Sequence, residues 1–185
     1  MVEFGEGNHF SLNKKIKLAK HPKMPGNGLF ATEKIEAGEI VWKDHTEYAL
    51  VDFDTLKTWP KEKYDEFVHF AYQVKENALL GPVYKDGKLT QEDDASNYMN
   101  HCCDGNAWYV DFNTMTARVD IEEGDEVTYD YVLSEMNPTK GIDQCCCGAK
   151  CCRGKYTEND WKRKSLQEKY KDHFVPYLNE IIKKL

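Results

Sequence analysis

A cluster of closely spaced cysteines constrains the fold of this chain more than any other sequence feature. All seven cysteines lie after residue 100, and five of them fall within residues 145–152. Three thiols on one tight turn can hold one face of a tetrahedral Zn²⁺ ion. Here they form the pattern C-x-C-x4-C, made by Cys145, Cys147 and Cys152. A structural site needs a fourth ligand, so we predict that Cys102 or Cys103, the only distant cysteines, closes it.

Disulfide bonds and free thiols are the alternatives to metal binding. An odd number of cysteines, three of them in a row, fits a disulfide framework poorly. The first residues, MVEFGEGNHFSLNKK, lack the charged and then apolar order of a signal peptide. The apolar runs are also too short to span a membrane. We therefore expect an intracellular protein, in the nucleus or the cytoplasm, that does not act at a membrane.

Length and charge narrow the class of partner. A chain of 185 residues has room for one domain with a real core. Its formal net charge is −7, from 32 acidic and 25 basic residues, which argues against direct binding of a nucleic-acid backbone. An acidic surface would attract a lysine-rich protein, although negative charge that only maintains solubility is the simpler interpretation. Nothing in the composition indicates the oligomeric state.

The order of the predicted elements indicates the fold class. Residues 10–52 read as short strands joined by turns, and strands return between residues 108 and 131. Between these regions a helix is predicted to begin near Thr58, with an apolar face that extends to about Val74. Because strands and helices do not alternate, we predict a mainly β fold with α insertions (α+β) rather than a Rossmann-type fold.

The last part of the chain is predicted to be helical. A helix begins near Thr157, and Asp160 three residues later is a candidate partner in a capping box. Pro176 interrupts this helix, and residues 177–185 continue as a second amphipathic stretch.

Two further segments carry groups that could line a binding site. In NYMNHCCDGN, Asn100 and His101 stand among aromatic and small polar residues that need hydrogen-bond partners if buried. In EVTYDYV, the alternation of a strand would put Tyr129 and Tyr131 on the same face. Taken alone, each has an ordinary structural explanation: a hydrogen-bonding node in the first case and amphipathic packing in the second.

Together these segments resemble the SET-domain family of protein lysine methyltransferases, in the order in which that family has them. GNGLFA at residues 26–31 is similar to the family's G-x-G turn. NHCCDGN at 100–106 is similar to its Asn-His motif, and GDEVTYDY at 124–131 to its tyrosine motif. The cysteine pattern resembles the post-SET zinc motif, and the whole resemblance covers roughly residues 12–156.

The resemblance implies an arrangement of the chain. Residues 1–140 would form a SET domain of small β-sheets with a pseudoknot, and a helical insert would occupy about 54–90. Residues 141–156 would form the post-SET zinc-binding segment, and 157–185 a C-terminal helical extension.

The resemblance also implies ligands. The cofactor would be S-adenosyl-L-methionine, held by residues of the G-x-G turn and the Asn-His motif: Gly26, Asn27, Gly28, Leu29, Asn100 and His101. An aromatic residue after the zinc motif often covers the adenine, and the candidates here are Tyr156 and Trp161. The resemblance makes Cys103 the fourth ligand of a structural zinc ion, beside Cys145, Cys147 and Cys152.

The implied activity is protein-lysine N-methylation, with Tyr131 as the catalytic tyrosine and Tyr129 at the position that influences how many methyl groups are added. A tyrosine at 129 favours mono- or dimethyl products, and histone tails are the expected substrate. Near the position of a further channel tyrosine in the family stand Lys43 and Asp44, and Tyr48 is a candidate for that role. The alternatives are a methyltransferase of a non-histone protein, a catalytically silent SET module that binds proteins, and a zinc-binding interaction domain.

Overall fold

The computed structural model describes residues 11–44, 48–86, 88–89, 94–135 and 141–185. These residues form mostly short β-strands with a few short helices, which confirms the predicted fold class. Residues 92–94 of the sequence are Glu, Asp and Asp, and of these three acidic residues only Asp94 lies within the described residues.

A five-stranded mixed sheet is the centre of the molecule, and its strand order is β3-β11-β10-β12-β9. Its members, in chain order, are β3 (Ile40–Lys43), β9 (Asn100–His101), β10 (Ala107–Tyr109), β11 (Thr114–Ala117) and β12 (Thr128–Tyr129). Strand β12 runs parallel to both β10 and β9, and Tyr129 pairs with His101. The Asn-His motif and the tyrosine motif of the sequence therefore lie side by side on adjacent strands.

An N-terminal hairpin brings the glycine-rich turn to the same region. It consists of β1 (Ile16–Lys20) and β2 (Asn27–Ala31), which pair antiparallel. The backbone N–H of Val127 donates to the carbonyl of Leu29 at 2.8 Å, so β2 is tied to the segment that leads into β12.

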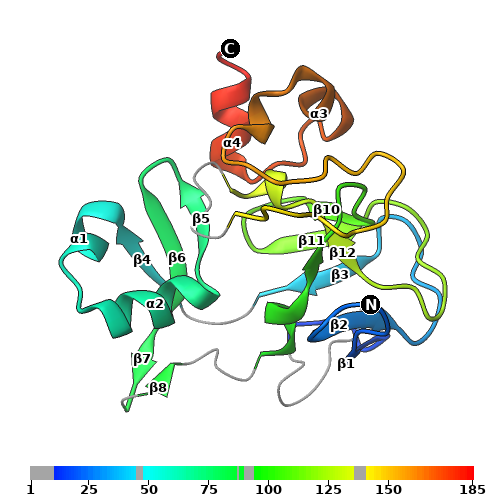
Figure 1. The fold of residues 1–185 in the computed structure, drawn as a ribbon, viewed down its shortest axis with the longest axis horizontal. Helices are drawn as coiled ribbons and strands as arrows, with labels where there is room; N and C mark the ends of the chain where they lie inside the picture. Colours follow the sequence, from blue (N-terminus) through cyan, green and yellow to red (C-terminus); the bar gives the residue numbers. More distant parts are fainter. Residues whose placement is uncertain (1–10, 45–47, 87, 90–93, 136–140) are drawn as a thin grey trace.

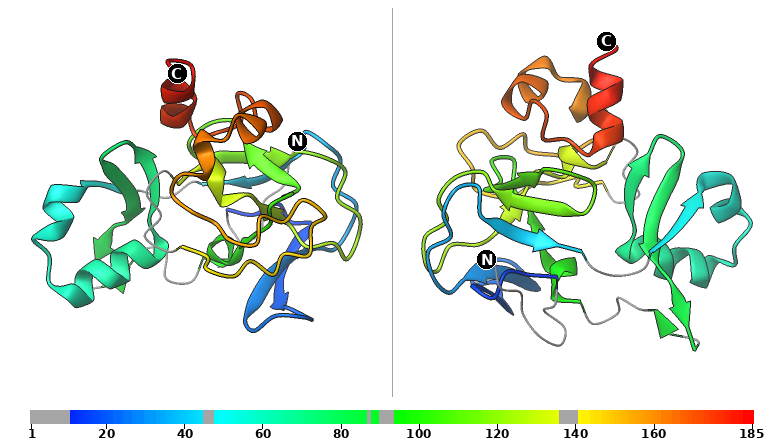
Figure 2. Two further views of the ribbon diagram at one scale, coloured as in Figure 1. Left: turned by 45° about the horizontal axis from the view of Figure 1, so that its top comes forward. Right: turned by 180° about the vertical axis from the view of Figure 1, so that it is seen from behind.

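The insert between β3 and β9 forms a small unit with its own core, and Figures 1 and 2 show it at one side of the central sheet. Its sheet has the order β4-β6-β5. Its elements are β4 (Tyr48–Asp52), α1 (Phe53–Lys57), α2 (Lys61–Phe70), β5 (Tyr72–Lys75), β6 (Ala78–Pro82), β7 (Tyr84–Lys85) and β8 (Lys88–Leu89). The apolar core of the unit consists of Val51, Leu56, Phe67, Val68 and Leu79.

The insert contains the predicted helix, but the helix ends earlier than predicted. Helix α2 begins directly after Pro60 and stops at Phe70. Val74 lies instead in β5, because the chain turns after Ala71 and pairs with β6. The insert is therefore not purely helical: two strands of its sheet lie within the region that the sequence pattern assigned to helix and turns.

Outside the sheets and the insert, the helical segments are short. They are the 3-10 helices η2 (Ala95–Tyr98), η3 (Tyr131–Leu133) and η4 (Asp160–Lys162), and the helices α3 (Lys164–Lys169) and α4 (Pro176–Ile182). Both C-terminal helices lie above the central sheet in Figure 1, and Leu166 and Leu178 pack into its core. No helix in the described part of the chain is long and apolar enough to cross a membrane.

Two sequence predictions about these segments are corrected. The strand expected to reach residue 131 ends at Tyr129, because the Asp130 side chain accepts the Val132 N–H and turns the chain into η3. No helix begins at Thr157, whose hydroxyl bonds the Asp160 carboxylate, and the first C-terminal α-helix starts at Lys164. The helical tail is interrupted earlier than predicted, because α3 ends at Lys169, and Pro176 is the first residue of α4.

Candidate active site and metal centre

Four cysteine sulfurs gather at the edge of the central sheet. They belong to Cys103, Cys145, Cys147 and Cys152, and all lie within 4.8 Å of one another. A tetrahedral Zn²⁺ with Zn–S bonds of about 2.3 Å separates its sulfurs by about 3.8 Å. The Cys103 and Cys145 sulfurs are 3.9 Å apart, so the cluster could hold a metal ion. Of the two distant cysteines, the fold brings Cys103 rather than Cys102 into this group.

Backbone hydrogen bonds shape the turn that presents three of these thiols. The N–H of Cys145 donates to the carbonyl of Gly154 at 2.7 Å, and Gly148 adopts a positive φ of 73° between the cysteines. Burial raises the pKa of Cys103, whereas the pKa of Cys147 falls to about 7, because backbone N–H groups and neighbouring thiols outweigh its burial. Metal binding would therefore release a proton from Cys103.

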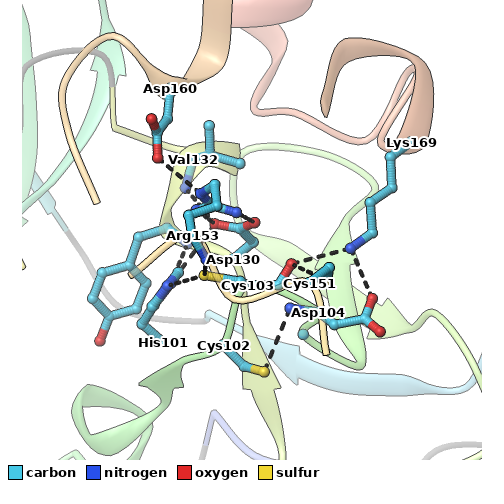
Figure 3. Close-up of polar contacts among 12 residues, drawn as sticks. His101, Cys102, Cys103, Asp104, Asp130, Val132, Cys151, Arg153, Asp160 and Lys169 are labelled. Carbon is cyan, nitrogen blue, oxygen red and sulfur yellow. Dashed lines mark hydrogen bonds and ion pairs between the residues drawn. The ribbon is translucent and has the colours of Figure 1, made fainter. Parts of the chain in front are cut away.

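A buried ion network, drawn in Figure 3, attaches the cysteine segment to the central sheet. The Arg153 guanidinium donates two hydrogen bonds to the Asp130 carboxylate, at 2.6 and 2.7 Å, and a third to Asp160 at 2.8 Å. The Asp130 side chain is fully buried and that of Arg153 is 7% exposed. No sequence pattern indicated this network, although Arg153 directly follows Cys152 and Asp130 stands between the two tyrosines.

His101 lies between the cysteine cluster and Tyr131. Its Nδ1 accepts the backbone N–H of Tyr131 at 3.2 Å, and its Nε2 is 3.4 Å from the Cys103 sulfur. Burial lowers the pKa of His101, so the imidazole is neutral at neutral pH. Since Nδ1 is an acceptor, the proton is on Nε2 and points at the sulfur. The imidazole ring of His101 thus contacts both a candidate metal ligand, Cys103, and the backbone of Tyr131.

The glycine-rich turn and the Asn-His motif meet at Glu126. Asn100 Nδ2 donates to the carbonyl of Asn27 at 2.9 Å and to Glu126 Oε1 at 2.7 Å. A Cβ at Gly28 would lie 2.4 Å from the same carboxylate oxygen, so any larger residue there would have to displace the Glu126 carboxylate. Leu29 is fully buried, so it can anchor the turn but not offer its side chain to a ligand. Glu126 lies in the tyrosine motif, and no sequence pattern singled it out.

An aromatic cavity of about 240 Å³ opens between the insert and the central sheet. Six of the aromatic side chains that line it are Trp42, Tyr48, Tyr72, Tyr109, Tyr129 and Tyr131. The rings of Tyr129 and Tyr131 are 4.9 Å apart, and the Tyr131 hydroxyl donates to the carbonyl of Met99 at 3.2 Å. Burial raises the pKa of Tyr131 to about 12 and that of Tyr129 well above its usual value. These phenols are therefore protonated at neutral pH.

The two candidate adenine-covering residues occupy different places. The Tyr156 ring lies 5.9 Å from that of His101 and 6.3 Å from that of Tyr131, beside the site. Trp161 is 5% exposed, and its Nε1 is buried without a hydrogen-bond partner in the described part of the chain. Tyr156 thus belongs to the same group of side chains as the two sequence motifs, and Trp161 has an unused donor.

Comparison with known proteins agrees with this arrangement. The family model for the SET domain matches residues 26–132, more than half of the chain. The chain is 30% identical over 160 residues to the putative histone-lysine N-methyltransferase ASHH4 of Arabidopsis thaliana, covering 82% of this chain and 42% of that protein. It is 30% identical over 141 residues to histone-lysine N-methyltransferase trithorax of Drosophila melanogaster, covering 69% of this chain and 3% of that protein.

The chain thus spans less than half the length of these curated relatives. Among solved structures, the methyltransferase domain of human histone-lysine N-methyltransferase SETMAR has a TM-score of 0.52 and 22% sequence identity. This likeness covers 77% of this chain and 58% of that one, and it supports the fold. The matched motifs, their adjacency in space and the shared fold lead to one conclusion: this chain belongs to the SET-domain family.

Proposed function

We propose that this chain is an S-adenosyl-L-methionine-dependent protein-lysine N-methyltransferase that acts on histones. The observation that carries the proposal is the aromatic cavity in which Tyr129 and Tyr131 lie beside the strand of Asn100 and His101. The names of the relatives, which are histone-lysine methyltransferases, support the same activity and substrate class. A nuclear location would follow from a histone substrate.

The glycine-rich turn and Asn100 suit the proposed cofactor. Nothing lies within 4 Å of the place that a Cβ at Gly26 would take, so the backbone is open to a ligand there. Asn100 donates one hydrogen bond to the Asn27 carbonyl of the turn and one to Glu126. When bound, S-adenosyl-L-methionine supplies an activated methyl group. The protein then has to align the nitrogen of the target amine with that methyl group. Such alignment contributes much of the rate enhancement of a transfer reaction.

The cavity also favours the reactive form of lysine. A free lysine amine has a pKa of about 10.4, so it enters mostly as the ammonium ion. Burial among aromatic walls disfavours the charged form, which promotes loss of the proton. Tyr131 is protonated at neutral pH and so serves as a positioned hydroxyl rather than as a base. Its bond to the carbonyl of Met99 fixes the direction of that hydroxyl.

A structural zinc ion is part of the proposal. Cys103, Cys145, Cys147 and Cys152 would hold it, and His101 would donate its Nε2 proton to the Cys103 thiolate. Four protein ligands leave no open coordination position, as is typical of structural rather than catalytic zinc. The ion would fix the cysteine segment, and through it Tyr156, beside the cofactor side of the site.

The test is transfer of labelled methyl groups from S-adenosyl-L-methionine to purified core histones and to a whole-cell lysate. We expect label on a discrete lysine-containing protein, and loss of at least a hundredfold in kcat for Tyr131→Phe with unchanged cofactor affinity. Calorimetric titration with S-adenosylhomocysteine measures that affinity separately. A folded, zinc-loaded wild type that binds the cofactor product but labels nothing would contradict the proposal and favour a silent protein-binding module.

A further inference from the structure

His21 organises the turn that joins β1 to β2. Its backbone N–H donates to the Gly26 carbonyl at 3.0 Å, which closes the turn directly before β2. Its ring Nδ1 accepts the backbone N–H groups of Lys23 and Met24, at 3.0 and 2.9 Å. Without the ring, these two N–H groups would lose their acceptor inside the turn. The backbone that leads into the glycine-rich turn therefore depends on one imidazole.

The same ring contacts the tyrosine motif. Backbone N–H groups can only donate, so Nδ1 carries no proton and the ring proton is on Nε2. Nε2 lies 3.2 Å from Glu126 Oε2, and the side chains of His21 and Glu126 are 10% and 18% exposed. The tautomer that the turn requires is thus the one that donates to this carboxylate. Partial burial makes such a charge-assisted hydrogen bond stronger than the same contact in water.

Glu126 connects His21 to the Asn-His motif. Its Oε1 accepts the Asn100 Nδ2–H at 2.7 Å, and the same amide nitrogen donates to the Asn27 carbonyl at 2.9 Å. The two carboxylate oxygens therefore have partners on two separate elements, the N-terminal hairpin and β9. The last torsion of a glutamate is soft, so a carboxylate held by one oxygen alone could rotate. The hydrogen bond from His21 fixes the direction in which Glu126 receives Asn100.

We propose that His21 is a positioning residue for the cofactor S-adenosyl-L-methionine, acting through Glu126 and Asn100 on the glycine-rich turn. The inference rests on the proposed function and adds to it a residue outside the segment 26–132 that the family model matches. A histidine that only stabilises its own turn would need Nδ1 but not Nε2. The two ring nitrogens have different partners, so they can be tested separately.

The first experiment replaces one ring nitrogen at a time. In His21→Gln the side-chain N–H can take the place of Nε2 beside Glu126, and in His21→Asn the amide oxygen can replace Nδ1 as the acceptor within the turn. Calorimetry measures the affinity of each zinc-loaded variant for S-adenosylhomocysteine, and a thermal scan measures its stability. We expect binding to weaken by about tenfold or more in His21→Asn and by less than about threefold in His21→Gln. Lys17→Gln, an exposed change on β1 of the same hairpin, is the matched control and should bind like wild type.

The second experiment tests the route through Glu126. His21→Asn should weaken binding much less in a Glu126→Gln background than in wild type, because the contact that it removes is already disrupted. With a peptide that the wild type methylates, His21→Asn should raise the KM for S-adenosyl-L-methionine by about tenfold and change kcat and the peptide KM much less. Long-range proton–nitrogen NMR of the wild type should place the His21 proton on Nε2, and this measurement requires no variant.

The outcomes separate this inference from the proposed function. Weakening by His21→Gln that equals or exceeds that of His21→Asn, additive losses in the double variant, or a proton on Nδ1 would each overturn the positioning role. If binding of S-adenosylhomocysteine depends on His21 and Glu126 as expected but no protein is labelled, the proposed function fails and the positioning role stands. A folded, zinc-loaded wild type that does not bind S-adenosylhomocysteine would overturn both.

Discussion

The buried ion network predicts a large and specific loss of stability when Arg153 is replaced. In Arg153→Met the side chain keeps most of its volume but leaves the Asp130 carboxylate, which is fully buried, without its two strongest hydrogen bonds. Asp160 also loses its 2.8 Å partner. Removing one member of a buried ion pair typically costs about 3–5 kcal/mol, because an uncompensated charge remains.

That cost is large compared with the total stability of a domain, which is about 5–15 kcal/mol. For a chain of this size, 1 kcal/mol corresponds to a shift of about 2–4 °C in melting temperature. We therefore expect Arg153→Met to melt roughly 6–20 °C below wild type in a thermal scan of the zinc-loaded protein, and urea titration to give the same ranking.

The control is an ion pair of the same kind on the surface. Lys34 lies 2.8 Å from Asp120, and both side chains are about half exposed. Exposed ion pairs contribute little to stability, so Lys34→Met should change the melting temperature by only a few degrees. The double variant Arg153→Met with Asp130→Asn should be less destabilised than the sum of its single changes, because no charge stays buried. A loss below 1 kcal/mol for Arg153→Met, or full additivity in the double variant, would refute the reasoning.

Four further predictions follow from the site. Tyr129→Phe should move the products toward higher methylation, because it removes a hydroxyl that crowds the amine; mass spectrometry of the product peptide decides this. Cys103→Ser should lower the bound zinc per chain and the melting temperature, whereas Cys146→Ser, outside the four-sulfur group, should leave both unchanged in metal analysis and a thermal scan. Gly28→Ala should weaken binding of S-adenosylhomocysteine by about tenfold or more in calorimetry, since the added methyl group would displace the carboxylate that holds the glycine turn. Finally, burial raises the pKa of Tyr131 from its usual value near 10 to about 12. The stability that the protonated ring contributes is therefore complete below pH 10 and is lost as the pH rises toward 12. Unfolding followed by tyrosinate absorbance should show that the free energy of unfolding falls in this pH window, and a flat profile would contradict the prediction.

Local patterns were sufficient for much of the fold. Alternation and turn residues place strands in the N-terminal part and between residues 108 and 131, and the structure has them there. The end of α2 could not be predicted, because Val74 continues an apolar helical pattern as well as it fits a strand. Pairing with β6 decides between the two, and that contact depends on residues several positions further along the chain.

In the candidate site, too, the sequence predicted some features and the tertiary structure decided others. Residue types and spacing alone predicted a metal site that requires one distant thiol, and the family's motifs pointed to Cys103, Asn100, His101, Tyr129 and Tyr131. What surrounds these residues depended on the tertiary structure. The buried carboxylates of Asp130 and Asp44 and the placement of Glu135 in the cavity leave no periodic signal, because a charged residue reads as exposed until its partners are known. Their partners come from other elements of the chain, and only folding brings those elements together.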